Sequence, residues 1–190
     1  AANKAVLVRV PKNEEVYIKH SLDAGADGVI VPMINSAEDA HKAVAHSYYP
    51  PFGTRGVGLS RAQGFGKKFN EYKDWSNENL IVIAQIEHKD AIENLEEIAE
   101  VKGIDAMMIG PYDLSASMGY PGEFDLPIVK EAMDKFTYIC ESKKMPRGLH
   151  IVPIETERYY TAVEQGYSFI AFGTDFQFLN HSLAQLPKVN

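Results

Sequence analysis

The sequence predicts an α/β fold with a parallel sheet, because short apolar, β-branched runs alternate with helical patterns along the whole chain. Six strand–helix units can be recognised, and no linker or low-complexity segment divides them. Strands that are apolar throughout are buried on both faces, as in an open doubly wound sheet or a (β/α) barrel. We therefore expect residues 1–190 to form one domain of this class.

The expected strands lie near residues 5–10, 28–33, 80–87, 105–110, 147–152 and 169–173. Most segments between them have helical spacing of apolar residues, but residues 50–79 and 111–125 have weak periodicity and indicate loops. Ser36 precedes an expected helix and is a candidate N-cap, because its hydroxyl can accept from an N–H group of the first turn. In either fold, functional residues gather at the carboxyl ends of the strands.

Composition and charge argue against several classes of protein. The 190 residues carry a net charge of −7, whereas a nucleic-acid binder needs a basic face. No apolar run approaches the roughly 20 residues that cross a bilayer. The one cysteine, Cys140, lies in a helical pattern, is expected to pack in the core, and favours a reducing compartment. We therefore expect a cytoplasmic protein that binds neither nucleic acid nor membrane.

Polar side chains interrupt the apolar strands near their carboxyl ends. Arg9 lies in the first strand, Gln85 and Glu87 end the third, and Asp113 follows the fourth. Because side chains alternate between the faces of a strand, Gln85 and Glu87 share one face, which points to the mouth of a barrel. His150 is the only histidine inside an expected strand.

Glu87 and Asp113 end consecutive parallel strands, which lie about 4.8 Å apart. Two carboxylates this close repel each other unless one is protonated or a cation bridges them. A hard divalent cation would relieve the repulsion and leave most of an octahedral Mg²⁺ or Mn²⁺ shell open to water and substrate. The alternative is that Glu87 caps a helix start and Asp113 caps a turn. Spacing alone leaves both interpretations open.

Arg9 also has two interpretations. A guanidinium inside a sheet is costly unless it meets an anion. Arg9 could hold a substrate carboxylate or steady a developing enolate oxygen. It could equally form a structural ion pair with Glu87 or Asp113.

The 53–66 loop contains five glycines and two arginines. A phosphate cradle is one interpretation, but the loop matches neither the Walker spacing nor the dinucleotide-binding fingerprint. The other interpretation is an ordered loop whose glycines permit tight turns.

A resemblance to a known family rests on four stretches: YPPFGTRGVG, VIAQIEHKDAIENLEEI, GIDAMMIGPYDLSASMGYPG and FIAFGTD. They resemble the HpcH/HpaI aldolases, the metal-dependent class II pyruvate aldolases. The resemblance covers nearly the whole chain in order. Its most specific part is a Gln-x-Glu strand end followed some twenty residues later by Gly-Pro-x-Asp-Leu-Ser.

The resemblance implies a TIM (β/α)8 barrel in which Glu87 and Asp113 bind a divalent metal, Mg²⁺, Mn²⁺ or Co²⁺. Pyruvate would chelate this metal through its carboxylate and keto oxygens. Backbone N–H groups near Tyr112 and Asp113 would hold the pyruvate carboxylate. Asp113 is therefore expected to bind both metal and substrate.

The resemblance also implies a catalytic role for Arg9, which matches the family's arginine and would stabilise the enolate oxygen. Gln85 would line the same mouth and contact the substrate. On this interpretation, Gly110 and Pro111 turn the chain tightly so that Asp113 faces the substrate.

The family pattern has two further βα units ahead of the first visible strand. They carry an acid–histidine pair that acts as base through a metal-bound water. Only six of eight units are visible, and roughly 60 residues are missing against a typical length of about 250. We therefore expect an N-terminally incomplete barrel. His150 lies on a different strand and is not assigned as the base.

The function implied is reversible retro-aldol cleavage of a 4-hydroxy-2-oxo acid to pyruvate and an aldehyde. The resemblance also implies a homo-oligomer, a hexamer, and the aromatic segments HSYYPPF and FNEYKDW are candidates for subunit contacts or for core packing. One alternative is a citrate lyase β-like enzyme acting on acyl-CoA esters, which would need a basic groove for phosphates. Another is a non-catalytic barrel fragment that binds metal and oxo acid.

Overall fold

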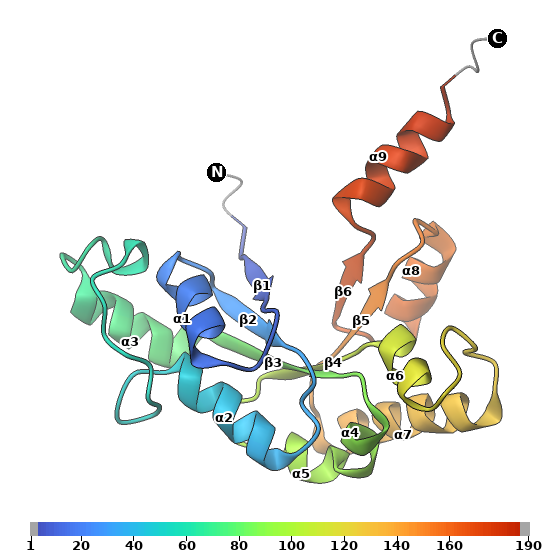
Figure 1. Ribbon diagram of the computed structural model, residues 1–190, viewed down its shortest axis with the longest axis horizontal. Coiled ribbons are helices and arrows are strands. Elements are labelled where there is room, and N and C mark those ends of the chain that lie inside the picture. Colours follow the sequence, from blue (N-terminus) through green and yellow to red (C-terminus); the bar gives the residue numbers. More distant parts are fainter. Residues whose placement is uncertain (1–3, 187–190) are drawn as a thin grey trace.

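The computed structural model describes residues 4–186, in which strands and helices alternate (Figure 1). The strands are β1 (Leu7–Arg9), β2 (Gly28–Val31), β3 (Ile81–Ile86), β4 (Ala106–Ile109), β5 (Arg147–Ile151) and β6 (Phe169–Phe172). The helices are α1 (Glu15–Asp23), α2 (Ala37–Ser47), the short 3-10 helix η1 (Arg61–Gln63), α3 (Phe69–Asn79), α4 (Lys89–Glu93), α5 (Leu95–Ala99), α6 (Pro111–Ser117), α7 (Pro127–Lys143), α8 (Thr156–Glu164) and α9 (Asp175–Ala184).

The six strands form one parallel sheet in the order of the sequence. The sheet curls into a half-barrel, with most of the helices along its outer side (Figure 1). The α/β class and the six parallel strands were predicted correctly. Within residues 4–186, β1 and β6 each pair on one side only, so these residues do not close a barrel. The expectation of an eight-unit barrel with its first two units absent stays a prediction. The expectation that residues 1–190 form a single domain also stays a prediction, and residues 1–3 and 187–190 lie outside the described residues.

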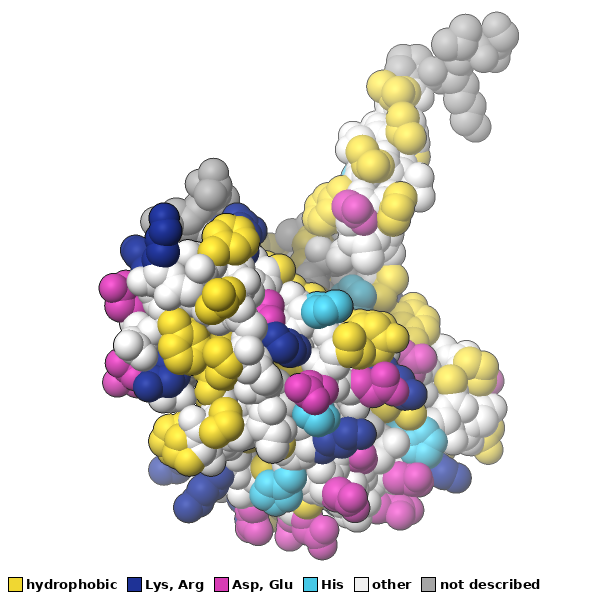
Figure 2. Space-filling model, turned by 60° about the vertical axis from the view of Figure 1, so that its left-hand side comes forward, with side chains coloured by type: hydrophobic (Ala, Val, Ile, Leu, Met, Phe, Trp, Pro, Cys, Tyr) yellow, Lys and Arg dark blue, Asp and Glu magenta, His cyan; other side chains and the backbone are white. Residues whose placement is uncertain are grey.

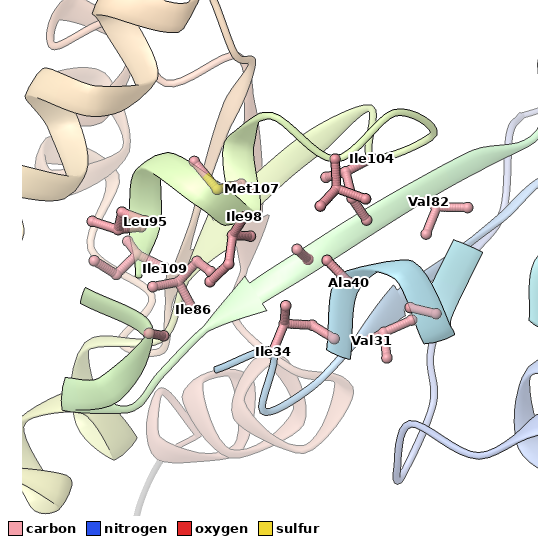
Figure 3. Close-up of a cluster of buried hydrophobic side chains, with 14 of the residues drawn as sticks. Val31, Ile34, Ala40, Val82, Ile86, Leu95, Ile98, Ile104, Met107 and Ile109 are labelled. Atoms are coloured by element: carbon pink, nitrogen blue, oxygen red, sulfur yellow. The ribbon is translucent and has the colours of Figure 1, made fainter. Parts of the chain in front are cut away.

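The two faces of the sheet bury different sets of side chains, as the period-two pattern of the strands requires. Outward-facing residues such as Val82, Ala84 and Ile86 pack against the helices in the main core, part of which is shown in Figure 3. Inward-facing residues form a smaller cluster: Ile83, Ala106 and Met108, with Leu7, Ile30, Ile81, Phe169 and Ala171 against it. The inward face therefore leads up to the carboxyl ends of the strands.

Two local predictions are confirmed. Ser36 is the N-cap of α2, and its hydroxyl oxygen accepts a hydrogen bond from the N–H of Asp39 at 3.1 Å. Cys140 is fully buried on α7, within the main core.

The prediction that residues 50–79 are a loop was wrong over its second half. This segment contains η1 and the eleven-residue helix α3. The helical pattern is weak because α3 buries only Tyr72 and Ser76, while Phe69 and Trp75 are partly buried and the other seven residues are polar. Tyr72 stacks on Trp75 one turn later, with ring centroids 5.7 Å apart.

The prediction of a loop over residues 111–125 was also wrong at its start. Residues Pro111–Ser117 form α6, with Pro111 in the first turn. Proline suits this position because its fixed φ is helical and its missing N–H would have had no acceptor there. Asp113 consequently lies in the first turn of a helix rather than in an extended loop.

The expected helix after β3 is interrupted at Asn94, which separates α4 from α5. Its side-chain Nδ2 donates to the carbonyl oxygen of Asn35 at 2.8 Å, which ties this interruption to the loop after β2.

The 53–66 loop is held to the body of the protein by Arg55. This side chain is fully buried, forms an ion pair with Asp23 at 2.6 Å, and lies over the rings of Tyr49 and Tyr72. Its guanidinium is therefore engaged internally, which favours the interpretation as an ordered loop. In the aromatic segments, Tyr49 and Tyr72 are core residues, whereas Phe52 is exposed.

No helix among residues 4–186 has both the length and the apolar character needed to cross a membrane.

Candidate active site

The residues predicted for the site converge at the carboxyl ends of β1, β3 and β4. Arg9 ends β1, Gln85 and Glu87 lie at the end of β3, and Asp113 lies in the first turn of α6 after β4. The pairing of Gln85 with Met108 and of Ile86 with Ile109 sets Glu87 beside Gly110. The parallel order of the sheet thus brings these side chains to one mouth.

Gly110 allows Glu87 to lie against the end of β4. A Cβ atom at this position would lie 3.2 Å from Oε2 of Glu87 and 3.3 Å from Nε2 of Gln85. Any larger residue would have to displace the two polar side chains. The Gly-Pro pair after β4 therefore has two separate effects: the glycine makes room for Glu87, and the proline begins α6.

Glu87 is held by hydrogen bonds to both of its carboxylate oxygens. The N–H of Met33 donates to Oε1 at 2.9 Å, and Nε2 of Gln85 donates to Oε2 at 2.6 Å. The Glu87 side chain is only 2% exposed, and Nη2 of Arg9 lies 3.9 Å from its Oε1.

The pKa of Glu87 is raised, and burial is the largest cause. The hydrogen bond from Met33 and the charge of Arg9 oppose this shift, while the nearby charge of Asp113 adds to it. The site therefore holds a desolvated carboxylate beside a second acid, an arrangement that a bound cation would stabilise.

Arg9 is the cationic member of the cluster. Its Nε donates to Oε1 of Gln85 at 3.2 Å, and its side chain is half exposed. The ion pair with Glu87 that was predicted as a structural alternative is thus present. Because the guanidinium is not enclosed, it is also accessible to a ligand in the mouth.

A cavity of about 300 Å³ lies at this mouth. It is lined by Gln85, Gly110, Pro111, Tyr112, Asp113, His150 and Val152. Tyr112 is half exposed and packs edge-on against Phe124. The cavity is large enough for a small oxo acid and lies next to the cluster of Arg9 and Glu87.

A second cavity of about 270 Å³ adjoins the first and shares Pro111, Tyr112, His150 and Val152 with it. Its lining is mainly apolar and includes Met133 of α7, Leu149 of β5 and Ala162 of α8. Neither Gln85 nor Asp113 lines this second cavity, whereas both line the first.

Comparisons with known proteins agree with this arrangement. The sequence pattern of the HpcH/HpaI aldolase/citrate lyase family matches residues 1–182. The chain belongs to this family. A 5-keto-4-deoxy-D-glucarate aldolase of Klebsiella pneumoniae is 36% identical over 175 residues, which cover 92% of this chain and 67% of that protein. A protein of the same name from Escherichia coli is 38% identical over 173 residues, which cover 90% of this chain and 66% of that protein.

A solved structure of an HpcH/HpaI aldolase/citrate lyase family protein from Burkholderia cenocepacia J2315 has the same architecture. It is 33% identical, with a TM-score of 0.87, and the match covers 94% of this chain and 70% of that one. The chain thus spans about two thirds of the length of the curated relatives that it matches.

The donor atoms of this HpcH/HpaI chain fit a hard divalent cation. Among residues 4–186, no group of three or more His, Cys, Asp or Glu side chains is arranged to hold a metal. The carboxylates of Glu87 and Asp113 are close enough for Asp113 to raise the pKa of Glu87. Two oxygen ligands from the protein suit Mg²⁺ or Mn²⁺, which keep several positions for water and substrate.

Two features of the mouth were missed or left unassigned at the level of sequence. His150 lines the mouth, since it pairs with the inward-facing Ala171, and its place inside a strand was the available signal. The N–H of Met33 donates to Glu87, and the sequence gives no signal for this contact because every residue except proline has a main-chain N–H.

Proposed function

We propose that this chain carries the site of a class II aldolase, a carbon–carbon lyase that cleaves a 4-hydroxy-2-oxo acid to pyruvate and an aldehyde. The observation that carries the proposal is the buried Glu87, fixed at both oxygens between Arg9, Gln85 and Met33 and lying beside Asp113. Named relatives that are 36% and 38% identical are aldolases, which supports the same reaction class.

Glu87 and Asp113 would hold the divalent cation, Mg²⁺, Mn²⁺ or Co²⁺. When bound, this cation supplies Lewis-acid polarisation of the 2-keto oxygen of the substrate. The N–H groups of Tyr112 and Asp113, in the first turn of α6, would bind the substrate carboxylate, because N–H groups of a first turn have no acceptor within the helix.

Arg9 would act on the reacting atoms themselves. In the retro-aldol step, the 4-hydroxyl loses its proton, the C3–C4 bond breaks, and its electron pair forms the enolate. Negative charge then grows on the 2-oxygen, and the accessible guanidinium of Arg9 can donate hydrogen bonds to it. Gln85 keeps Arg9 and Glu87 in place, because its amide oxygen accepts from Arg9 and its amide nitrogen donates to Glu87.

The proton acceptor for the 4-hydroxyl is assigned to no described residue. From the family resemblance, we propose that an acid–histidine pair ahead of β1 acts as this base. The open edge of β1 in the described residues leaves room for such units beside it.

The chain is also proposed to assemble with copies of itself. Helix α9 extends away from the body of the protein (Figure 1), and no residue of it is buried. Hydrophobic side chains lie on the surface of this projecting arm (Figure 2). Phe176, Leu179 and Leu183 recur at helical spacing and are 72%, 61% and 62% exposed, which suits a contact with another subunit.

The test is pyruvate release from a panel of 4-hydroxy-2-oxo acids that includes 5-keto-4-deoxy-D-glucarate. We expect release to require Mg²⁺, Mn²⁺ or Co²⁺ and to stop when EDTA removes the cation. Acyl-CoA esters run in parallel test the citrate lyase alternative. Two outcomes would overturn the proposal. One is cleavage of an acyl-CoA ester with no release of pyruvate. The other is a protein that includes the βα units ahead of β1, binds cation and pyruvate tightly, and still shows no turnover.

A further inference from the structure

The loop between β2 and α2 reaches the mouth through its main chain. The N–H of Met33 donates to Oε1 of Glu87 at 2.9 Å, and the next N–H, of Ile34, donates to the carbonyl oxygen of Gln85 at 3.3 Å. On the far side, Asn35 is anchored, because its N–H donates to Asp39 at 3.1 Å and its carbonyl oxygen accepts from Asn94 at 2.8 Å. The loop is therefore held in register with the end of β3.

Met33 adopts a left-handed backbone conformation, with φ of 53°. Residues with a Cβ atom rarely adopt it, because Cβ approaches the following carbonyl oxygen. Met33 is not a core residue that packing would force into this conformation, since 47% of the residue is exposed. Backbone strain of this kind is found where the surrounding structure enforces it, and here its direct result is an N–H group aimed at Glu87.

We propose that Met33 is a positioning residue whose left-handed backbone aims its N–H at Glu87 and so fixes this carboxylate for cation binding. The inference rests on the proposed role of Glu87 as a cation ligand. The hydrogen bonds from Met33 to Oε1 and from Gln85 to Oε2 restrain rotation of the carboxylate. A ligand that is already oriented gives up less freedom on binding, and partners behind metal ligands commonly control affinity for this reason.

The test uses substitutions that differ in their tolerance of the left-handed region. Glycine and asparagine adopt it readily, whereas β-branched residues do not. By calorimetry, we expect Met33→Gly and Met33→Asn to bind Mn²⁺ close to the wild-type affinity. We expect Met33→Ile to bind Mn²⁺ about tenfold or more weakly, the scale seen when groups behind metal ligands are changed.

Lys144 provides a matched control. It has the same left-handed backbone, with φ of 54°, but lies at the C-terminus of α7. Lys144→Ile should lower Tm as Met33→Ile does, yet leave Mn²⁺ affinity unchanged. If Met33→Ile also lowers Tm and leaves Mn²⁺ affinity unchanged, Met33 has only a structural role and the inference is wrong.

Hydrogen exchange of the Met33 amide gives a second readout that needs no Met33 variant to fold. Without any metal, this amide should exchange faster in Glu87→Ala than in the wild type, because its acceptor is gone. Equal exchange rates in the two proteins would overturn the inference.

The Mn²⁺ affinities separate this inference from the proposed function. Failure of the wild type to bind Mn²⁺ would overturn the proposed function, whereas equal Mn²⁺ affinities of the wild type and Met33→Ile would overturn this inference alone.

Discussion

Arg9 and Gln85 are joined by a hydrogen bond of 3.2 Å, from Nε to Oε1, although they lie 76 positions apart in the sequence. The other end of the same amide donates to Glu87 at 2.6 Å. Gln85 thus links the guanidinium of Arg9 to the buried carboxylate of Glu87, and these two groups set the orientation of its amide. A carboxylate at this position could not donate to Glu87, and a lysine could not accept from Arg9.

The first prediction concerns Arg9→Lys. Lysine keeps the positive charge but loses the planar fork of donors. Since the enolate charge grows mostly in the transition state, kcat should fall by about 10²-fold or more, with a smaller rise in KM. Steady-state pyruvate release under saturating Mn²⁺ measures both constants. A variant with raised KM and normal kcat would show that Arg9 serves only to bind the substrate or to pair with Glu87.

The second prediction compares the two carboxylates. Glu87→Ala and Asp113→Ala should each abolish cation-dependent activity and greatly weaken Mn²⁺ binding, because each removes one of the two oxygen ligands. Both variants should keep the fold, since removing one acid relieves repulsion between the pair. Calorimetry gives the affinity, and circular dichroism gives the fold.

Stability should separate these variants. Asp113 is exposed, so Asp113→Ala should change the free energy of unfolding by no more than about 0.5 kcal/mol. Glu87→Ala leaves the donors of Met33 and Gln85 without their acceptor, so it should be the less stable variant. Unchanged Mn²⁺ affinity in Glu87→Ala would rule out its role as a ligand, and outright unfolding would favour a structural role.

The arrangement of the mouth could be predicted from sequence as far as it depends on strand order and strand face. Alternating strands and helices imply parallel neighbours, and the period of two puts Gln85 on the inward face with Ile81 and Ile83. Those two rules were enough to bring Glu87 near the end of the next strand. The roles of these residues stay predictions.

The features that sequence did not reveal depend on contacts between distant or main-chain groups. Arg55 is buried because Asp23, on a helix far earlier in the chain, pairs with it. Met33 adopts a left-handed backbone conformation, which sequence patterns normally predict only for glycine or asparagine. Helix α6 buries only Leu114 and Ser115, which are too few positions to produce a helical pattern, so the sequence alone indicates a loop there.

The third prediction concerns the single thiol. Cys140 is fully buried, and burial raises its pKa to about 12. Because the thiolate is the reactive form, the native protein should not react with a thiol reagent at pH 8, and one thiol should react after unfolding. The folded state favours the protonated thiol, so this contribution to stability is present at neutral pH and is lost as pH rises from 9 towards 12. Rapid reaction of the native protein would show that α7 opens readily.

The last prediction concerns assembly through α9. Phe176, Leu179 and Leu183 form an exposed apolar stripe, whereas His181 lies on the opposite side of the helix. If the stripe contacts another subunit, Leu179→Glu combined with Leu183→Glu should shift the protein to a smaller species in sedimentation velocity. This change should leave Mn²⁺ affinity intact, because α9 contributes no residue to the mouth cavity. His181→Glu adds an acid to the same helix but off the stripe, so it should leave the assembly unchanged. A single sedimenting species common to the wild type, the double variant and the control would show that the stripe does not hold subunits together.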